Sequence, residues 1–106
     1  MGFGTPSVLT ISSYTLTVTG TSEYRSHLIK TENLVESDNV TTINGGNVGE
    51  LLMLRPHSDF NTVIFVKSST LRLQTDFVAS SNRSILLLHC AASGLWEEVS
   101  RSTNEN

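Results

Sequence analysis

The sequence contains little cysteine, few aromatic residues and few charges. Cys90 is the single cysteine, which excludes an internal disulfide and leaves too few thiolates for a zinc site. We expect Cys90 to be a small buried thiol in a strand. Only 16% of the residues are charged, the net charge is −3, and the Lys and Arg residues are scattered. The chain therefore lacks the basic face of a nucleic-acid-binding protein, and no nucleic-acid partner is expected.

Long hydrophobic runs are also missing. The longest apolar stretch, Ile85–Leu88, is far shorter than the ~20 residues of a membrane helix, so no membrane association is expected. The segment Met1–Pro6 has no basic region followed by an apolar run, as a signal peptide would have. We therefore expect a soluble protein that is made in the cytoplasm.

No set of catalytic or metal-binding residues emerges from the motifs. His27, His57 and His89 do not fall at metal-ligand spacing, although a three-histidine site assembled across the fold or across a threefold axis remains an alternative. Glu97 and Glu98 are adjacent, and adjacent side chains of a strand point to opposite faces, so they cannot act as an acid/base pair. We expect no enzyme activity, no cofactor and no metal, and we set aside a small lectin-like hydrolase.

Alternation with a period of two runs through most of the chain. In Tyr14–Thr19 apolar residues alternate with threonines, which is typical of a half-buried strand. The segments Thr62–Lys67 and Ile85–Cys90 read as buried strands, and Asn44–Gly49 is the strongest turn signal, best explained as a hairpin. Strands recur about every 10 residues, which predicts an all-β fold, a compact antiparallel sandwich or barrel of about seven to nine short strands.

The 106 residues are enough for one domain with one core. We expect an N-terminal arm at residues 1–8, a single β-domain at 9–102, and a frayed polar tail at 103–106. The segment 33–42 reads as polar, with isolated apolar anchors. Trp96 is expected to close the core near the last strand. A domain of this size has a small stability margin, so self-association would help it.

Two motifs in the second part of the chain are distinctive: the turn Ile43–Gly46 followed by the Leu-x-Leu-Arg strand at Leu52–Arg55, which is the more specific, and the ending Trp96–Ser102. With these motifs, the chain from Thr31 onward resembles a recurrent β-domain of tailed-bacteriophage virion proteins. The resemblance covers about two thirds of the chain. Ser68–Thr70 stands where that family usually has Asp-Gly and Gly-Asn, and Ala91 and Ala92 stand where it tends to have a polar turn, but both changes fall in expected loops.

The resemblance implies a structural role without catalysis. Such domains occur in head-decoration (cement) proteins and in tail or head fibre proteins, commonly as trimers. We therefore expect a homotrimer on the outer capsid surface of the virion that bridges major capsid proteins and stabilises the head, made in the host cytoplasm. The residues expected to contact the capsid are Phe3, Pro6, Pro56, His57, Ser81, Asn82 and Arg83.

The alternative is a tail or head fibre, or a spike domain, that binds a glycan on the host surface. Under this reading Trp96, Tyr24 and His57 would contact the sugar. Carbohydrate sites usually expose several aromatic rings, and this chain has one Trp and two Tyr, so the composition favours the capsid reading.

Overall fold

The structure, a computed structural model, describes residues 7–18, 24–58, 61–80 and 83–103. It confirms an all-β fold. The described residues form eleven strands and one short 3-10 helix. The elements are β1 (Ser7–Thr10), β2 (Thr15–Val18), β3 (Tyr24–Lys30), η1 (Glu32–Leu34), β4 (Ser37–Val40), β5 (Thr42–Gly45), β6 (Leu51–Pro56), β7 (Thr62–Phe65), β8 (Leu71–Arg72), β9 (Phe77–Ala79), β10 (Ser84–Ala92) and β11 (Leu95–Thr103).

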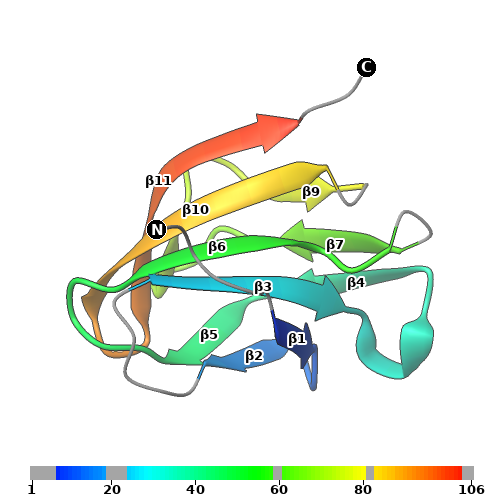
Figure 1. Cartoon of the computed structure of the whole chain (residues 1–106), viewed down its shortest axis with the longest axis horizontal. Helices are drawn as coiled ribbons and strands as arrows, with labels where there is room; N and C mark the ends of the chain where they lie inside the picture. Colours follow the sequence, from blue (N-terminus) through cyan, green and yellow to red (C-terminus); the bar gives the residue numbers. More distant parts are fainter. Residues whose placement is uncertain (1–6, 19–23, 59–60, 81–82, 104–106) are drawn as a thin grey trace.

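The strands form one large sheet and two small ones. The large sheet has the order β1-β3-β6-β10-β11-β8, and the small sheets are β4-β7-β9 and β2-β5. Figure 1 shows β3, β6, β10 and β11 crossing the molecule one above another. Fully buried residues from all three sheets, among them Leu86, Phe65 and Leu16, belong to one hydrophobic core. The chain therefore folds as a compact β-domain around a single core.

The predicted alternation is visible in the burial of individual strands. In β10, which lies between β6 and β11, Leu86, Leu88 and Cys90 are fully buried, while the residues between them are half-buried. In β2, Leu16 and Val18 are buried and Thr17 is exposed. Period-two patterning thus sets which face of each strand enters the core.

Strand direction is where the sequence prediction was wrong. We expected antiparallel sheets, but β1–β3, β3–β6, β2–β5, β4–β7 and β8–β11 pair in parallel. Only β6–β10, β10–β11 and β7–β9 are antiparallel pairs of named strands in the described part of the chain. The physical reason is that alternation fixes the buried face of a strand and carries no information on its partner. Successive strands here often enter different sheets, so their loops are not hairpins.

The strand count also exceeds the predicted seven to nine. The segment 33–42, read as polar with isolated anchors, contains the last two residues of η1, all of β4 and the first residue of β5, and Val40 is fully buried. At the ends, Ser7 and Val8 belong to β1 and not to an arm, and β11 continues to Thr103. Short strands with one or two buried side chains leave too weak an alternation to detect.

The Asn-Gly-Gly turn is a connection between sheets and not the predicted hairpin. β5 pairs with β2, whereas β6 pairs with β3 and β10. Gly45 and Gly46 both have φ +91°, and a Cβ at Gly46 would overlap with the Trp96 ring and lie 3.3 Å from Cys90 Sγ. The backbone N–H of Gly94 donates to Gly45 O at 3.0 Å. Glycine is therefore required at position 46 both for the left-handed backbone and for the approach of Trp96.

The contact between Gly46 and Trp96 can be measured with two matched variants. Gly46→Ala and Gly49→Ala place a methyl group at φ +91° and +90°, but nothing lies within 4 Å of the position that a Cβ at Gly49 would take. Both variants bear the backbone strain, and only Gly46→Ala displaces the Trp96 ring. We expect Gly46→Ala to lower the free energy of unfolding by about 1–3 kcal/mol more than Gly49→Ala, measured by urea denaturation. Equal losses in the two variants would contradict the packing role.

Candidate functional site

The residues predicted to touch the capsid lie in several places. Phe3, Pro6, Ser81 and Asn82 fall outside the described residues. The remaining three are Pro56, His57 and Arg83. Pro56 is the last residue of β6, where it is buried opposite Ile29 and unavailable as a surface contact. It is buried because it continues the inward-facing set of β6, which also contains Leu52 and Leu54.

His57 and Arg83 are both exposed and lie at the same end of the large sheet. β6 and β10 are antiparallel, with Leu54 opposite Leu86, so the residue that follows β6 and the residue that precedes β10 come to one edge. The His57 backbone N–H donates to Ile29 O at 2.9 Å, which fixes the start of its loop. The structure thus brings together two of the seven predicted contact residues.

The residues proposed for glycan binding do not form a site. Trp96 is fully buried, so its use as an exposed sugar platform is wrong; its ring fills the core against Gly46. Tyr24 begins β3 opposite Leu51, and His57 follows the far end of β6. About six residues of extended strand separate those two levels, or roughly 20 Å.

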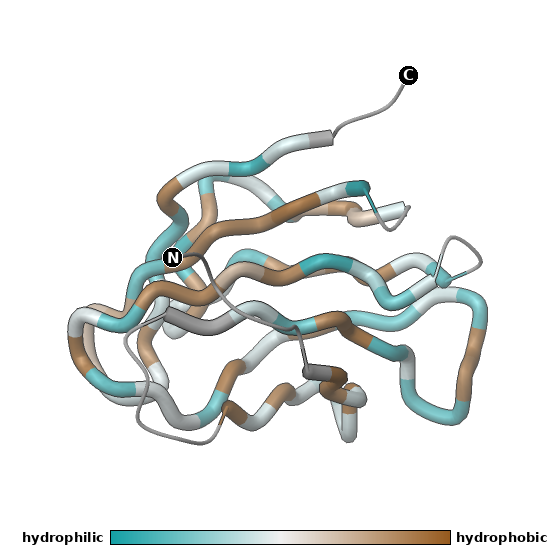
Figure 2. Tube along the Cα trace, viewed as in Figure 1, coloured by the Kyte–Doolittle hydropathy of each residue, from teal (hydrophilic) through white to brown (hydrophobic). Residues whose placement is uncertain are grey.

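The outward face of the large sheet carries a row of apolar side chains. Leu87 lies opposite Met53, Met53 lies opposite Ser26 on β3, and Val8 of β1 lies opposite Leu28. Figure 2 shows hydrophobic positions along much of β10. Six outward-facing residues form what we call the outer apolar stripe: Val8, Leu28, Leu51, Met53, Ile85 and Leu87. Val8 is exposed and the other five are half-buried.

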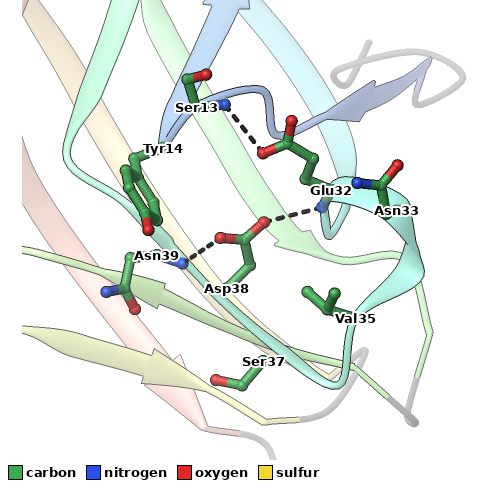
Figure 3. A pocket seen from close by; sticks show the side chains of 8 residues that line it. All are labelled: Ser13, Tyr14, Glu32, Asn33, Val35, Ser37, Asp38 and Asn39. Carbon is green, nitrogen blue, oxygen red and sulfur yellow. Dashed lines mark hydrogen bonds between the residues drawn. The ribbon is translucent and has the colours of Figure 1, made fainter.

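A polar pocket lies beside the edge that carries His57, where β3 ends next to β6: His57 N donates to Ile29 O, and Asn61 Nδ2 donates to the pocket residue Val35 at its carbonyl oxygen, both at 2.9 Å. Its volume is about 540 Å³, within the usual range of ligand pockets. The β1–β2 turn, η1 and β4 supply its walls, and Figure 3 shows Asp38 between the Tyr14 ring and the segment 32–35. The lining residues are Ser13, Tyr14, Glu32, Asn33, Val35, Ser37, Asp38 and Asn39.

The turn that carries Tyr14 is held in a costly conformation. Ser12 and Thr15 exchange two backbone hydrogen bonds of 3.0 Å, and Ser13 and Tyr14 between them have φ 51° and 62°. This is a two-residue hairpin turn with two left-handed residues, for which Asn-Gly is the favoured pair. The Tyr14 side chain is nevertheless 56% exposed and contributes nothing to the core.

Hydrogen bonds from backbone N–H groups to two carboxylates hold the walls of the pocket in place. Ser13 N donates to Glu32 Oε1 at 3.1 Å and so joins the turn to η1. Glu32 N donates to Asp38 Oδ2 at 2.8 Å, and Asn39 N donates to Asp38 Oδ1 at 2.8 Å. Asp38 is thus engaged at both oxygens as a brace between η1 and β4. This pocket was not predictable from the sequence, because its residues come from two segments, 13–14 and 32–39, and match no motif.

An ion pair fixes the end of β11. Arg101 Nε donates to Glu98 Oε2, and Arg101 Nη2 to Glu98 Oε1, both at 2.8 Å. Arg101 Nη2 also donates to Thr75 O at 2.7 Å, and its guanidinium lies 4.9 Å from the centroid of the Phe77 ring. The Arg101 hydrogen bonds outweigh the effect of burial and lower the pKa of Glu98 below its ordinary value of 4.5. Arg101, part of the motif Trp96–Ser102, therefore anchors the segment before β9 to β11.

The single cysteine behaves as the sequence predicts. Cys90 is fully buried in β10 and donates from Sγ to Ala92 O at 3.1 Å. Burial, and next the charge of Glu50, raise the pKa of the Cys90 thiol. Such a thiol is poorly suited to act as a nucleophile.

Comparison with models of known protein families, with curated proteins and with solved structures finds no match. Among the described residues, no group of three or more His, Cys, Asp or Glu side chains could hold a metal ion. The described residues also form no helix that is long and apolar enough to cross a membrane.

The Glu98–Arg101 pair predicts a specific response to acid. The pKa of Glu98 is lowered in the folded state, so the ionised Glu98 stabilises the fold fully above the ordinary pKa of 4.5. This stabilisation is lost as the pH falls below that value, since the unfolded state binds the proton first. We expect the urea midpoint of Glu98→Gln to fall less between about pH 7 and about pH 3 than that of the wild type.

The matched control is Glu97→Gln. The Glu97 carboxylate pairs with Arg72 at 3.1 Å with 43% of its side chain exposed, against 6% for Glu98. Exposed pairs contribute little, so Glu97→Gln should keep the wild-type acid dependence. If both variants flatten the dependence equally, the Glu98–Arg101 pair is not its source.

Proposed function

We propose that this protein is a structural component of a tailed-bacteriophage particle: a homotrimeric decoration protein on the outer capsid surface that bridges major capsid proteins. The sequence resemblance from Thr31 onward supports the class of protein. Two details of the fold are consistent with it, since Trp96 and Arg101, which carry the second motif, both have structural roles. The proposed role is non-enzymatic.

The outer apolar stripe is the observation that carries the proposed assembly. Leu, Met, Ile and Val side chains from four strands share this face; Arg55 lies among them, opposite Leu28, and Lys30, His89 and Glu97 border them as half-buried polar residues. An apolar centre with a polar rim is the usual anatomy of an interface between subunits. The domain measures 32 × 31 × 25 Å, so a broad face offers roughly the 800 Å² that each partner buries in a standard interface.

A second copy of the chain is the occupant that we propose for the stripe. The chain has a small core and a low charge, and a single domain of this size has a small margin of stability. Contact between copies would bury further apolar surface and so add stability. The edge that holds His57 and Arg83 lies at the ends of the strands, outside the stripe. In a trimer built on the stripe, three copies of this edge remain available for the capsid, and simultaneous contacts strengthen attachment.

A charge placed within the stripe should prevent trimer formation. Leu87→Glu puts a carboxylate in the centre of the stripe, opposite Met53, where burial in an interface would leave it unpaired. We expect Leu87→Glu to sediment as a monomer at low micromolar concentration while the wild type sediments as a trimer. Val78→Glu is the control, because Val78 is 53% exposed on β9 in another sheet. A trimeric, folded Leu87→Glu would show that copies associate elsewhere.

Attachment to the capsid is tested with expanded shells that lack this protein. Wild-type protein should cosediment with the shells, and His57→Ala combined with Arg83→Ala should bind at least about tenfold more weakly, with an unchanged oligomeric state. Arg72→Ala, which removes an exposed arginine of β8, is the control and should bind normally. A wild-type protein that is monomeric and does not bind the shells would refute the proposed function.

A further inference from the structure

From the pocket at the β1–β2 turn we infer a second activity, independent of attachment to the capsid: recognition of a neutral oligosaccharide. This site replaces the dispersed residues that the sequence suggested for glycan binding. The Tyr14 side chain is 56% exposed at the wall of a cavity of about 540 Å³. A cavity of that size holds more than one sugar ring, since ligand pockets start at about 300 Å³.

The position of Tyr14 is unfavourable for folding and suited to binding. A Tyr at φ 62° costs free energy that glycine would not, and the cost is not recovered by burial of the side chain. Thr41 holds the turn in place, because Tyr14 O accepts hydrogen bonds from Thr41 N at 2.9 Å and from Thr41 Oγ1 at 3.3 Å. Strained residues of this kind gather where a ligand is held.

The chemistry of the lining selects the class of ligand. None of the eight lining residues is Lys or Arg, and two are carboxylates, so a phosphate, a sulfate or an acidic sugar is repelled. Apart from the Tyr14 ring, Val35 is the single large apolar side chain among the described lining residues, too little for a lipid or another apolar ligand. A ligand that offers hydroxyl groups at its edge and an apolar C–H face fits both features.

The remaining polar groups match sugar hydroxyls. Ser13 N donates a hydrogen bond to Glu32 Oε1. Among the described residues no donor contacts the other oxygen, Glu32 Oε2, so this oxygen can accept a hydrogen bond from a sugar hydroxyl. The amide side chains of Asn33 and Asn39 are exposed at the pocket and each offers a donor and an acceptor. We assign Tyr14 the role of stacking platform and Glu32, Asn33 and Asn39 the role of hydrogen-bonding residues. Asp38 positions Glu32 through its backbone N–H.

Binding is tested by saturation-transfer NMR on the full chain with three neutral disaccharides at millimolar concentration: lactose, maltose and di-N-acetylchitobiose. Sialyllactose is the acidic comparison, and spermidine and Ca²⁺ test the carboxylates as a cation site. We expect transfer to at least one neutral disaccharide, with no need for Ca²⁺, and a weaker signal from sialyllactose. The inference would be overturned if none of the three neutral sugars showed transfer, or if sugar binding required Ca²⁺. It would also be overturned if spermidine bound and no sugar did.

Two variants separate binding from folding. Tyr14→Gly removes the ring and relieves the left-handed backbone, so it should raise the urea midpoint and weaken sugar binding at least about tenfold. Glu32→Gln keeps the oxygen that accepts from Ser13 N and should weaken binding severalfold without unfolding the protein. Glu97→Gln, a carboxylate change outside the pocket, should bind as the wild type. If the stabilised Tyr14→Gly variant binds sugar normally, Tyr14 is not the platform and the inference fails.

Discussion

The Trp96 ring lies against Gly46, and much of the fold depends on that contact. Position 46 has no side chain and a φ of +91°, which lets the connection between β5 and β6 pass directly over the ring. The same connection receives a hydrogen bond at Gly45 from the β10–β11 hairpin, through Gly94 N. Two stretches of sequence about fifty residues apart, which carry the two most specific parts of the phage resemblance, therefore meet in one packing unit.

The same residues show what could be predicted from sequence and what could not. The alternation of Leu86, Leu88 and Cys90 with half-buried residues correctly predicted a buried strand, because the period of a strand fixes its faces. The partners of that strand were not predictable, since pairing depends on contacts distant in the sequence. The segment 44–49 was correctly expected to contain a turn, which Glu50 N closes on Asn47 O, but Asn44 and Gly45 belong to β5, and the glycines at 45 and 46 serve a crossing between sheets and the approach of a ring.

The candidate sites were less predictable than the fold. Of the residues that we expected to contact the capsid, His57 and Arg83 are exposed and lie at one edge of the large sheet. The outer apolar stripe could not be predicted, because its residues belong to strands that are hydrophobic on both faces. The sequence does not show which of the two faces is left uncovered by other elements. The pocket was hidden for a different reason: Tyr14 fits the alternation of β2, and only the backbone angle shows that it lies in the preceding turn.

In this account each face of the domain has a separate task. The inner faces of the sheets hold the core; we propose that the outer face of the large sheet joins copies, that the edge with His57 and Arg83 reaches the capsid, and that the neighbouring pocket at the β1–β2 turn binds a sugar. The association of copies is the central claim, and native mass spectrometry of the purified protein tests it most directly. The account predicts a species of three 11.6 kDa chains at low micromolar concentration. A single chain as the dominant species would contradict it.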